Sequence, residues 1–565
     1  MREMTDDVRL EVVSRLKTDY GFKPVQDWLR QGQCPSCNRR EMFTKSTNPW
    51  VIKCGRENKC GHTANVKDLY PDAFGKFNER YPATTEYPNR TADRYMDFVR
   101  GLDPKKTKGW YRQGEFNHSW GDRKTATVVF DISRGENIFM ERLIETVRIT
   151  DPKTKKVDDR RANFGSVPYK GRWWTPPGQK LKDGDELWIV EGCIDAATLA
   201  VNGCKAAAIL SAYNLPDIEL DKLKSKNITL IWAMDNDRAG RRHIRKCVSH
   251  IDKNSTTLIN KAALIPQKDG KKVDWNDAHL ANKLTEKDMS RYRFHGDLLL
   301  AKSPMDKALR TWERYKSRNF AVEFETRTYW FTVVAEIYNA MMTQQADNGV
   351  TGIDAERKAV YKAARLEEIA NCNFKFLYFQ QDKQTDESWY YTRIEFPHGR
   401  HTIKNTFSGG QVATASEFKK RLLSIAPGAL YTGNSVQLNW LVKHYLDNIK
   451  IVETTDFIGY SKEHSVYVFN DRAVSAGKVI EINDEDFFEV GKTSIKSLNQ
   501  SLNLHIGDAT DYNDKWADMV YSAYGAKGLI ATAFFMGSLF AEQIREKQKS
   551  FPFLEIVGEA GAGKS

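Results

Sequence analysis

The stretches LWIVEGCID at residues 187–195 and ITLIWAMDNDRAG at residues 228–240 decide the fold of this chain. Each begins with an unbroken apolar run, which is typical of a strand buried on both faces of a parallel sheet. Each run ends at acidic residues. Because the carboxyl ends of parallel strands meet at one edge of an open α/β sheet, we expect these carboxylates to converge there. The two stretches therefore predict an α/β domain with an acidic site at one edge.

The same region contains further acidic residues. Beyond the two strand ends, the segment DWND at residues 274–277 adds another acidic pair. The candidate set comprises Glu191, Asp195, Asp235, Asp237, Asp274 and Asp277. Carboxylates gathered at one place repel each other unless divalent cations neutralise them. The set predicts a magnesium site of the kind used in phosphoryl transfer.

The motifs VEGCIDA at 190–196 and MDNDRAGR at 234–241 resemble the Toprim domain of bacterial-type DNA primases. The resemblance implies that Glu191 acts in acid/base catalysis of nucleotide transfer. It implies that Asp235 and Asp237 bind magnesium, with Asp195, Asp274 and Asp277 as further members of the metal cluster. The family often has Asp-x-Asp where this chain has DWND. Arg238, next to the paired aspartates, is a candidate contact to a nucleoside triphosphate.

Four cysteines near the N-terminus have the spacing of a zinc ribbon, C-x2-C followed by C-x5-C: Cys34, Cys37, Cys54 and Cys60. Four ligands leave no open position, so the predicted site is structural. His62 is an alternative fourth ligand. Basic residues surround Phe43 and Trp50, a combination that suits stacking on single-stranded DNA. The other reading, that Trp50 packs the core of the ribbon, stays open.

A basic subdomain is expected between the ribbon and the acidic core. Residues 125–130 and 137–149 read as strands, and the resemblance to primases implies that this part holds template and incoming nucleotides. Four basic side chains are candidate phosphate contacts here: Arg142, Arg160, Arg161 and Lys170. Each of them is also compatible with an ordinary solvated surface charge.

The C-terminal residues GEAGAGKS at 558–565 match the P-loop motif, with an expected buried strand at 553–557. The predicted ATP-phosphate contacts are Gly558, Gly563, Lys564 and Ser565. Backbone amides of such a loop hold phosphates, the lysine reaches the β and γ oxygens, and the serine binds magnesium. Because the following helix is missing, we expect a fragment of an ATP-dependent helicase that does not hydrolyse ATP by itself.

Composition bounds the remaining possibilities. The 565 residues suggest about three to five domains, and the net charge of +12 is compatible with nucleic acid without requiring it. The N-terminus lacks a secretory signal. The apolar stretch at 528–541 is too short to span a bilayer, so a buried helix and no membrane partner are expected. The cysteine pattern indicates an intracellular protein. The resemblance to primases implies the cytoplasm of a bacterium or of a phage-infected host.

The expected fold class is multidomain, α+β and α/β. The expected domains are a zinc ribbon (1–75), a basic primase subdomain (90–182), a Toprim catalytic domain (183–285), a mixed helix and strand region (300–455), a β-rich then helical pre-helicase region (456–550) and the start of a P-loop helicase domain (551–565). Within the mixed region, helices are expected at 335–342 and 354–369, and strands at 374–379 and 389–394.

The functional hypothesis is a bifunctional primase–helicase of phage or mobile elements that makes short RNA primers on single-stranded DNA. It implies structural zinc, catalytic magnesium, and ATP at the P-loop of the parent protein. Implied partners are the template, nucleoside triphosphates, replication proteins and further copies joined through the helicase domain. Two other functions stay open: phosphodiester cleavage by a Toprim nuclease or topoisomerase, and a non-catalytic DNA-binding module in replication.

Overall fold

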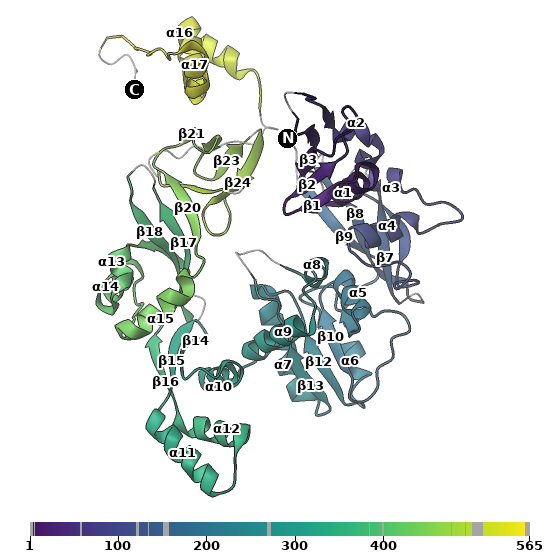
Figure 1. Cartoon of the computed structure of the whole chain (residues 1–565), viewed down its shortest axis with the longest axis vertical. Coiled ribbons are helices and arrows are strands. Elements are labelled where there is room, and N and C mark those ends of the chain that lie inside the picture. The colour runs from purple at the N-terminus through teal and green to yellow at the C-terminus, as the bar shows by residue number, and fades with distance from the viewer. Residues whose placement is uncertain are drawn as a thin grey trace. The chain divides into compact units, whose positions relative to one another are not determined.

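The computed structural model describes residues 4, 6–56, 59–119, 124–133, 135–150, 157–267, 273–382, 385–397, 401–475, 477–491, 493–499 and 512–559. The chain divides into two compact units, Met1–Ala301 and Lys302–Ser565. Figure 1 labels the helices and strands of both. The finer domain boundaries given above stay predictions.

An antiparallel sheet of order β1-β2-β3-β4-β5 opens the first unit. Its elements are α1 (Asp6–Tyr20), β1 (Lys23–Val25), β2 (Trp28–Gly32), β3 (Met42–Lys45), β4 (Val51–Cys54), β5 (Thr63–Asn65), α2 (Val66–Leu69) and a 3-10 turn, η1 (Pro71–Phe74). Val8, Val12 and Leu16 recur every four residues on α1, so they lie on one helix face. That face packs with Leu29 and Ile52 of the sheet.

A second antiparallel sheet, of order β6-β7-β8-β9, follows. Its elements are α3 (Phe77–Arg80), α4 (Arg90–Phe98), β6 (Arg112–Asn117), β7 (Lys124–Ser133), β8 (Ile138–Thr150) and β9 (Val157–Phe164). The strands expected at 125–130 and 137–149 are confirmed as parts of β7 and β8. Val128 and Phe130 of β7 share a hydrophobic core with Trp188 and Val190 of the following domain.

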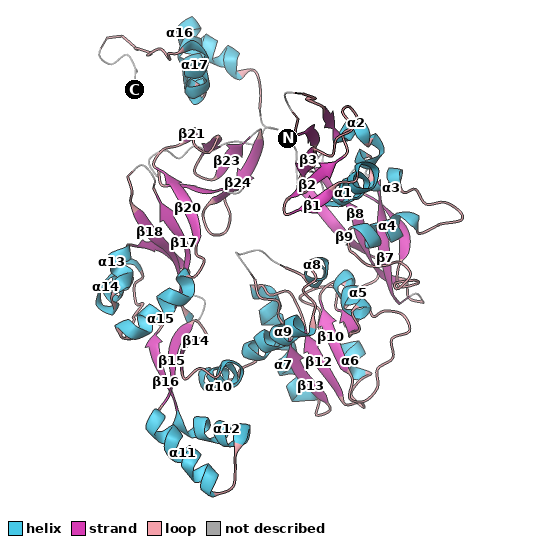
Figure 2. Cartoon of the chain, viewed as in Figure 1, coloured by secondary structure: helices cyan, strands magenta, loops and turns pink. Residues whose placement is uncertain are grey.

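That domain is a parallel sheet of order β11-β10-β12-β13 between helices (Figure 2). Its elements are β10 (Glu186–Val190), α5 (Cys193–Val201), β11 (Lys205–Ala208), α6 (Asp217–Asp221), β12 (Ile228–Trp232), α7 (Arg238–Asn254), β13 (Leu258–Ala262), α8 (Trp275–Leu280) and α9 (Glu286–Leu299). Alternate residues of β10 enter two separate cores, Trp188 with α5 and α8, Ile189 with α7. Both sheet faces are therefore buried, as the unbroken apolar runs predicted.

The second unit begins with the antiparallel sheet β14-β15-β16 and its helices. These are α10 (Pro304–Tyr315), β14 (Asn319–Phe324), β15 (Arg327–Val333), α11 (Ala335–Asp347), α12 (Gly352–Ala363) and β16 (Ala364–Ala370). The helix expected at 354–369 is wrong in its second half, because the chain becomes strand at Ala364. There it pairs with β15 along its whole length. Long-range pairing overrides the local helix propensity of this segment.

Two further sheets complete the second unit. The sheet of order β19-β18-β17-β20-β26-β25 is mixed, and β21-β22-β23-β24 is antiparallel. Their elements are β17 (Asn373–Gln381), β18 (Ser388–Glu395), β19 (Ile403–Phe407), α13 (Gly409–Ala413), α14 (Ala415–Ile425), α15 (Ser435–Leu446), β20 (Lys450–Thr455), β21 (Gly459–Ser461), β22 (Val466–Val468), β23 (Arg472–Ser475), β24 (Lys478–Glu481), β25 (Phe488–Val490) and β26 (Thr493–Ser497). The strands expected at 374–379 and 389–394 lie within β17 and β18.

The C-terminal segment departs from the sequence-based expectation. Helices α16 (Trp516–Leu539) and α17 (Ala541–Gln548) form, but no residue of α16 is buried. Its apolar side chains have no layer of described structure to cover them, so apolarity alone did not decide burial. None of the described helices is long and apolar enough by itself to cross a bilayer; α16 and α17, bent by 86°, pass that test only as a pair, on length and composition.

The strand expected at 553–557 does not form. Residues 551–559 have no regular secondary structure, and Phe553 and Val557 are exposed. A strand needs a neighbour for its backbone hydrogen bonds, and no described segment pairs with this one. Gly558 lies in this irregular segment. The predicted phosphate contacts Gly563, Lys564 and Ser565 lie outside the described residues, so the P-loop remains a prediction.

Candidate active site and metal centres

The parallel sheet holds two acidic strand ends side by side. Glu191 directly follows β10, and Asp235 follows β12, which is the neighbour of β10. The backbone N–H of Ala233 donates to the carbonyl oxygen of Ile189 (2.7 Å), and that of Leu210 donates to Glu191 (2.8 Å). Strand pairing therefore continues beyond the regular strands and positions the backbone that carries Glu191.

Asp195 lies in α5 and Asp274 caps α8, and one asparagine connects the two helices. Asp195 lies in the first turn of α5, and its Oδ1 accepts the backbone N–H of Asn276 in α8 (3.1 Å). The buried Asn276 amide donates to the carbonyl oxygen of Arg100 (2.8 Å) and to Thr198 Oγ1 (3.1 Å). Asn276 thus connects α8, α5 and the segment after α4, and it brings the DWND segment to Asp195.

The like charges of these carboxylates disfavour one another's ionisation. Burial, followed by the charges of Asp274 and Asp235, raises the pKa of Asp195 well above its usual value. Burial also raises the pKa of Asp274, and the charge of Asp277 adds to the shift. The guanidinium of Arg100 acts against both shifts. Partly buried carboxylates that hinder each other's ionisation fit a divalent cation, because a bound cation would favour their charged forms.

Two of these aspartates also cap helices. Asp237 caps α7 by accepting the Gly240 N–H (2.8 Å), and Asp274 caps α8 by accepting the Asp277 N–H (2.7 Å). Across the described residues, ligand atoms that all lie within 4.8 Å of one another occur at two other places and not among these acids. The aspartates therefore share an edge of the sheet without forming a closed metal cage, and their predicted roles stay predictions.

Gly240 is required by the tight turn after β12. A Cβ atom at this position would lie 2.1 Å from the carbonyl oxygen of Asp235. The absence of a side chain lets α7 begin directly against the strand end. Gly240 thereby allows the close approach of α7 to the backbone of Asp235.

The predicted basic contacts lie in different environments. Arg142 is half-buried on β8, whereas Arg161 and Arg238 are exposed. Arg160 is paired with Asp158 at 2.8 Å, which makes it less available to a phosphate. Arg100, which the sequence did not single out, is the basic side chain that acts on both Asp195 and Asp274. No sequence motif marks it, because it lies far from Asp195 and Asp274 in the sequence.

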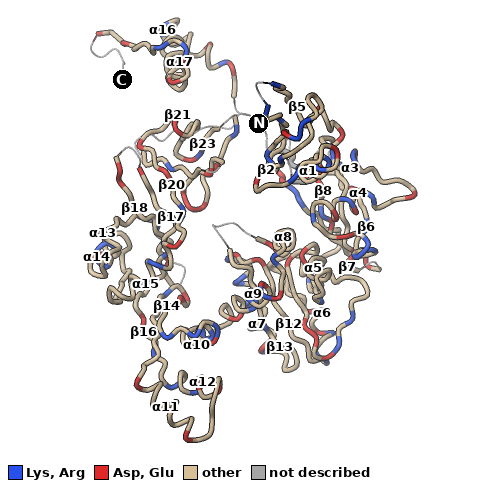
Figure 3. Tube along the Cα trace, viewed as in Figure 1, with Lys and Arg blue, Asp and Glu red and all other residues tan. Residues whose placement is uncertain are grey.

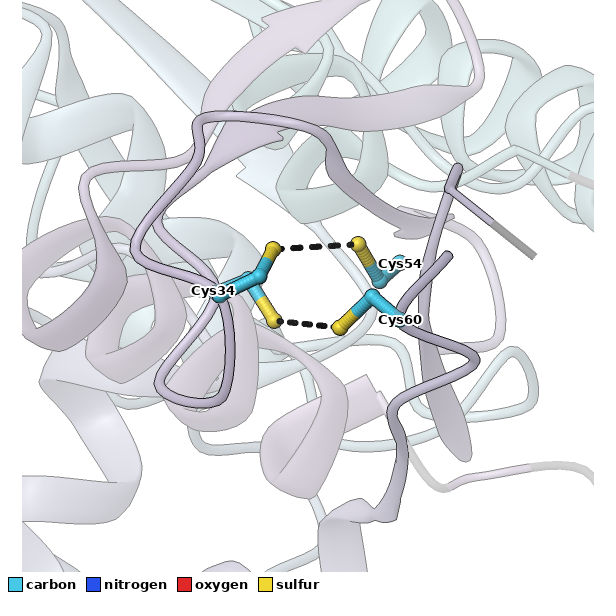
Figure 4. Close-up of side chains that lie close together, drawn as sticks. Cys34, Cys54 and Cys60 are labelled. Carbon is cyan, nitrogen blue, oxygen red and sulfur yellow. Dashed lines mark hydrogen bonds between the residues drawn. The ribbon is translucent and has the colours of Figure 1, made fainter. Parts of the chain in front are cut away.

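The four N-terminal cysteines form one cluster (Figure 4). All four sulfur atoms lie within 4.8 Å of one another, with Sγ distances of 3.8 Å for Cys34–Cys60 and 3.9 Å for Cys37–Cys54. Tetrahedral zinc with Zn–S bonds of about 2.3 Å separates its ligands by about 3.8 Å. The thiols therefore fit zinc, which they would hold without an open position. His62 is not part of the cluster, although its backbone N–H lowers the pKa of Cys60 to about 7.

The outer face of the ribbon sheet carries aromatic and basic side chains. Trp28 and Phe43 are in contact, with ring centroids 5.8 Å apart. Arg30 and Lys45 lie over the Trp28 ring at 5.7 and 5.8 Å. Figure 3 shows the basic residues along these N-terminal strands. Trp28 and Phe43 are half-buried, and Arg30 and Lys45 are exposed. This combination of partly accessible rings and cations suits nucleic-acid bases and phosphates.

Trp50 does not belong to that face. Its ring stacks on Phe74 at 5.2 Å and packs against the core of the ribbon. The core interpretation of Trp50 therefore holds, while Phe43 is available on the outer face. The sequence analysis did not identify Trp28. Along residues 28–30 and 42–45, buried side chains alternate with more exposed ones, and this alternation is the signal that could have identified Trp28.

Comparison with known proteins identifies the acidic domain. Residues 188–279 match the family model described as Toprim-like. The chain is 28% identical over 115 residues to the DNA primase DnaG of Halorubrum lacusprofundi, and 28% identical over 109 residues to that of Methanopyrus kandleri. These matches cover 20% and 19% of this chain and 22% and 25% of the relatives. The chain thus matches about a quarter of the length of these relatives.

Solved structures similar to this chain include the DnaG catalytic core, at 17% identity and a TM-score of 0.27, covering 44% of this chain and 88% of that one. The Aquifex aeolicus primase, with zinc-binding and RNA polymerase domains, has 15% identity and a TM-score of 0.25, covering 55% and 92%. These low scores add nothing to the family match. From that match and the sheet that carries it, residues 188–279 are a Toprim-like domain.

Proposed function

We propose that this chain is a DNA primase that synthesises short RNA primers on single-stranded DNA. The observation that carries the proposal is the set of acids at the carboxyl edge of β10 and β12, inside a Toprim-like domain. The DNA primases that share this region support the same activity. The cysteine cluster of the preceding ribbon adds a second, structural metal site on the same chain.

In the proposed reaction, a primer 3′-hydroxyl attacks the α-phosphate of a nucleoside triphosphate, a new P–O bond forms, and pyrophosphate leaves. Glu191 accepts the hydroxyl proton at its carboxylate. Asp235 and Asp237, with Asp195, Asp274 and Asp277, would hold magnesium, which supplies positive charge for the triphosphate when bound. Arg238, which is exposed in the first turn of α7, would meet the phosphate tail. Arg100 and Asn276 position Asp195 and Asp274.

The template contacts are proposed for two surfaces. Trp28 and Phe43 stack on bases while Arg30 and Lys45 meet phosphates. On the β6–β9 sheet, Arg142, Arg161 and the loop residue Lys170 are further candidates, and Arg160 contributes only if its pairing with Asp158 is exchanged for a phosphate. Zinc at the four cysteines keeps the ribbon folded, so it supports the first surface indirectly.

The finer parts of the hypothesis rest on the sequence motif alone. We propose that GEAGAGKS at 558–565 is the ATP-binding loop of a helicase domain in a larger primase–helicase of phage or mobile elements. Replication proteins, and further copies joined through that domain, would be the partners of the larger protein.

The test is primer synthesis on single-stranded DNA with labelled nucleoside triphosphates and magnesium. Glu191→Gln should abolish product while leaving DNA affinity unchanged. Glu286→Gln, a matched change at an exposed position at the start of α9, should keep full activity. Nicking of the DNA without synthesis would favour the nuclease or topoisomerase reading. DNA binding without any reaction would favour the non-catalytic module.

A further inference from the structure

A second group of potential metal ligands lies in the C-terminal unit, far along the sequence from the Toprim-like domain. Glu453 projects from β20, and Glu463 and His464 lie in the turn between β21 and β22. One ligand atom from each of the three residues lies within 4.8 Å of the other two. The hydrogen-bonded strands of two different sheets therefore bring two carboxylates and an imidazole together.

The imidazole is held in a defined orientation. Ser461 Oγ lies 2.7 Å from His464 Nδ1, and Glu453 Oε2 lies 2.7 Å from His464 Nε2. The His464 side chain is 9% exposed, so it has little freedom to turn away. When Ser461 accepts the Nδ1 proton, the Nε2 lone pair points toward Glu453 and is available to a metal. An outer hydrogen bond of this kind fixes the tautomer of metal-binding histidines.

A cavity of about 300 Å³ adjoins the three residues. It is also lined by Asp382, which is 7% exposed, and by Thr454, which is 8% exposed. The Thr454 hydroxyl oxygen is buried and has no hydrogen-bond partner among the described residues. An unpaired buried hydroxyl costs stability, and a ligand or a metal-bound water in this cavity would pair it.

The basic residue within this turn pairs with a carboxylate outside the three potential ligands. Lys462, between Ser461 and Glu463 in sequence, pairs with Glu542 of α17 at 2.5 Å. Its ammonium group is therefore directed to a different carboxylate. Two glutamates and a histidine facing one another are stabilised when a cation lies between them.

We propose that Glu453, Glu463 and His464 bind a divalent transition-metal ion, such as Zn²⁺, with its remaining position open to the cavity. One imidazole and two carboxylates are a ligand set that zinc accepts, and three protein ligands leave room for water or a small ligand. A serine hydrolase relay through Ser461, His464 and Glu453 is disfavoured, because Ser461 is only 4% exposed and a substrate cannot reach its oxygen.

The experiment counts zinc in the full chain after metal removal, reloading with Zn²⁺ and dialysis, using elemental mass spectrometry. Wild type should retain two zinc ions, one at the cysteine cluster and one at the proposed site. Glu463→Gln should retain one; because Glu463 is exposed, this variant should melt like wild type. Glu481→Gln, an exposed glutamate in β24, is the matched control and should retain two.

Two further variants separate the sites and the roles. Cys37→Ser combined with Glu463→Gln should lose both ions. Ser461→Ala should weaken zinc binding at the proposed site by about 10- to 100-fold, as expected for loss of an orienting hydrogen bond. One zinc in wild type, or two in a folded Glu463→Gln variant, would overturn the proposal. So would covalent labelling of Ser461 by a fluorophosphonate that is unaffected by zinc.

Discussion

Replacing Gly240 with alanine should damage the candidate active site through the backbone alone. The added Cβ would lie 2.1 Å from the Asp235 carbonyl oxygen and 3.4 Å from Met234 Cβ. Such Cβ–oxygen contacts are not seen below 3.0 Å, so the start of α7 must move away from β12 by roughly 1 Å. This movement separates Asp237 from Asp235.

The expected cost follows from that displacement. A misplacement of about 1 Å at a catalytic site lowers turnover on the order of 100-fold. Overpacking of this kind costs about 1–3 kcal/mol of unfolding free energy. An alanine in a helix without such a clash instead gains about 0.5–1 kcal/mol. The sign of the stability change therefore distinguishes the clash from the ordinary effect of the substitution.

Initial rates of nucleotide incorporation and thermal melting of the same preparations would measure both effects. Gly410→Ala provides the matched control, because Gly410 lies in α13 and its added Cβ would meet nothing within 4 Å. That control should keep full activity and melt slightly higher. A Gly240→Ala variant with the turnover and melting temperature of wild type would refute the assigned geometry of the turn.

Three other outcomes are expected. Trp28→Ala should weaken binding of single-stranded DNA by about 1–3 kcal/mol for a lost base stack, measured by fluorescence anisotropy; unchanged affinity would remove Trp28 from the interface. Cys37→Ser should release the zinc ion of the cysteine cluster and weaken template binding, while circular dichroism still reports a folded Toprim-like domain; retention of both zinc ions would contradict the four-thiol site. Burial lowers the pKa of Lys496 from 10.5 to about 8. Below pH 8 its charge is therefore less well solvated in the folded state than in the unfolded state. Unfolding free energy should consequently rise between about pH 8 and 10.5, by no more than about 2 kcal/mol after allowance for screening. Lys496→Met should remove this rise in denaturant titrations, and an unchanged pH profile would contradict it.

Expectations that rest on short-range patterns agree with the structure where it can be compared. The apolar runs at 187–190 and 228–232 are buried parallel strands, and the four N-terminal cysteines meet. Both features follow from local sequence, because a continuous apolar run must be buried and paired cysteines at this spacing suit one metal ion. The helix expected at 354–369 is wrong from Ala364 onward, because pairing with β15 overrides the helix propensity of that segment.

Exposure was the property that local pattern predicted least well. The apolar stretch 528–541 and the strand at 553–557 were expected to be buried, and no residue of either is. Burial depends on which surface is available to cover a segment. That information lies outside the segment itself.

The sequence by itself determined the acidic strand ends, the zinc-ribbon spacing and the Toprim resemblance, because each is built from short motifs whose own residues lie within a few positions of one another. Only the tertiary structure decided that Asn276 joins Asp195 to Arg100, and that Trp28 rather than Trp50 is on the outer face. It alone placed Glu453 beside His464. These contacts join segments that meet only after separate strands and helices have packed, so side-chain direction and burial, and not residue type, select them.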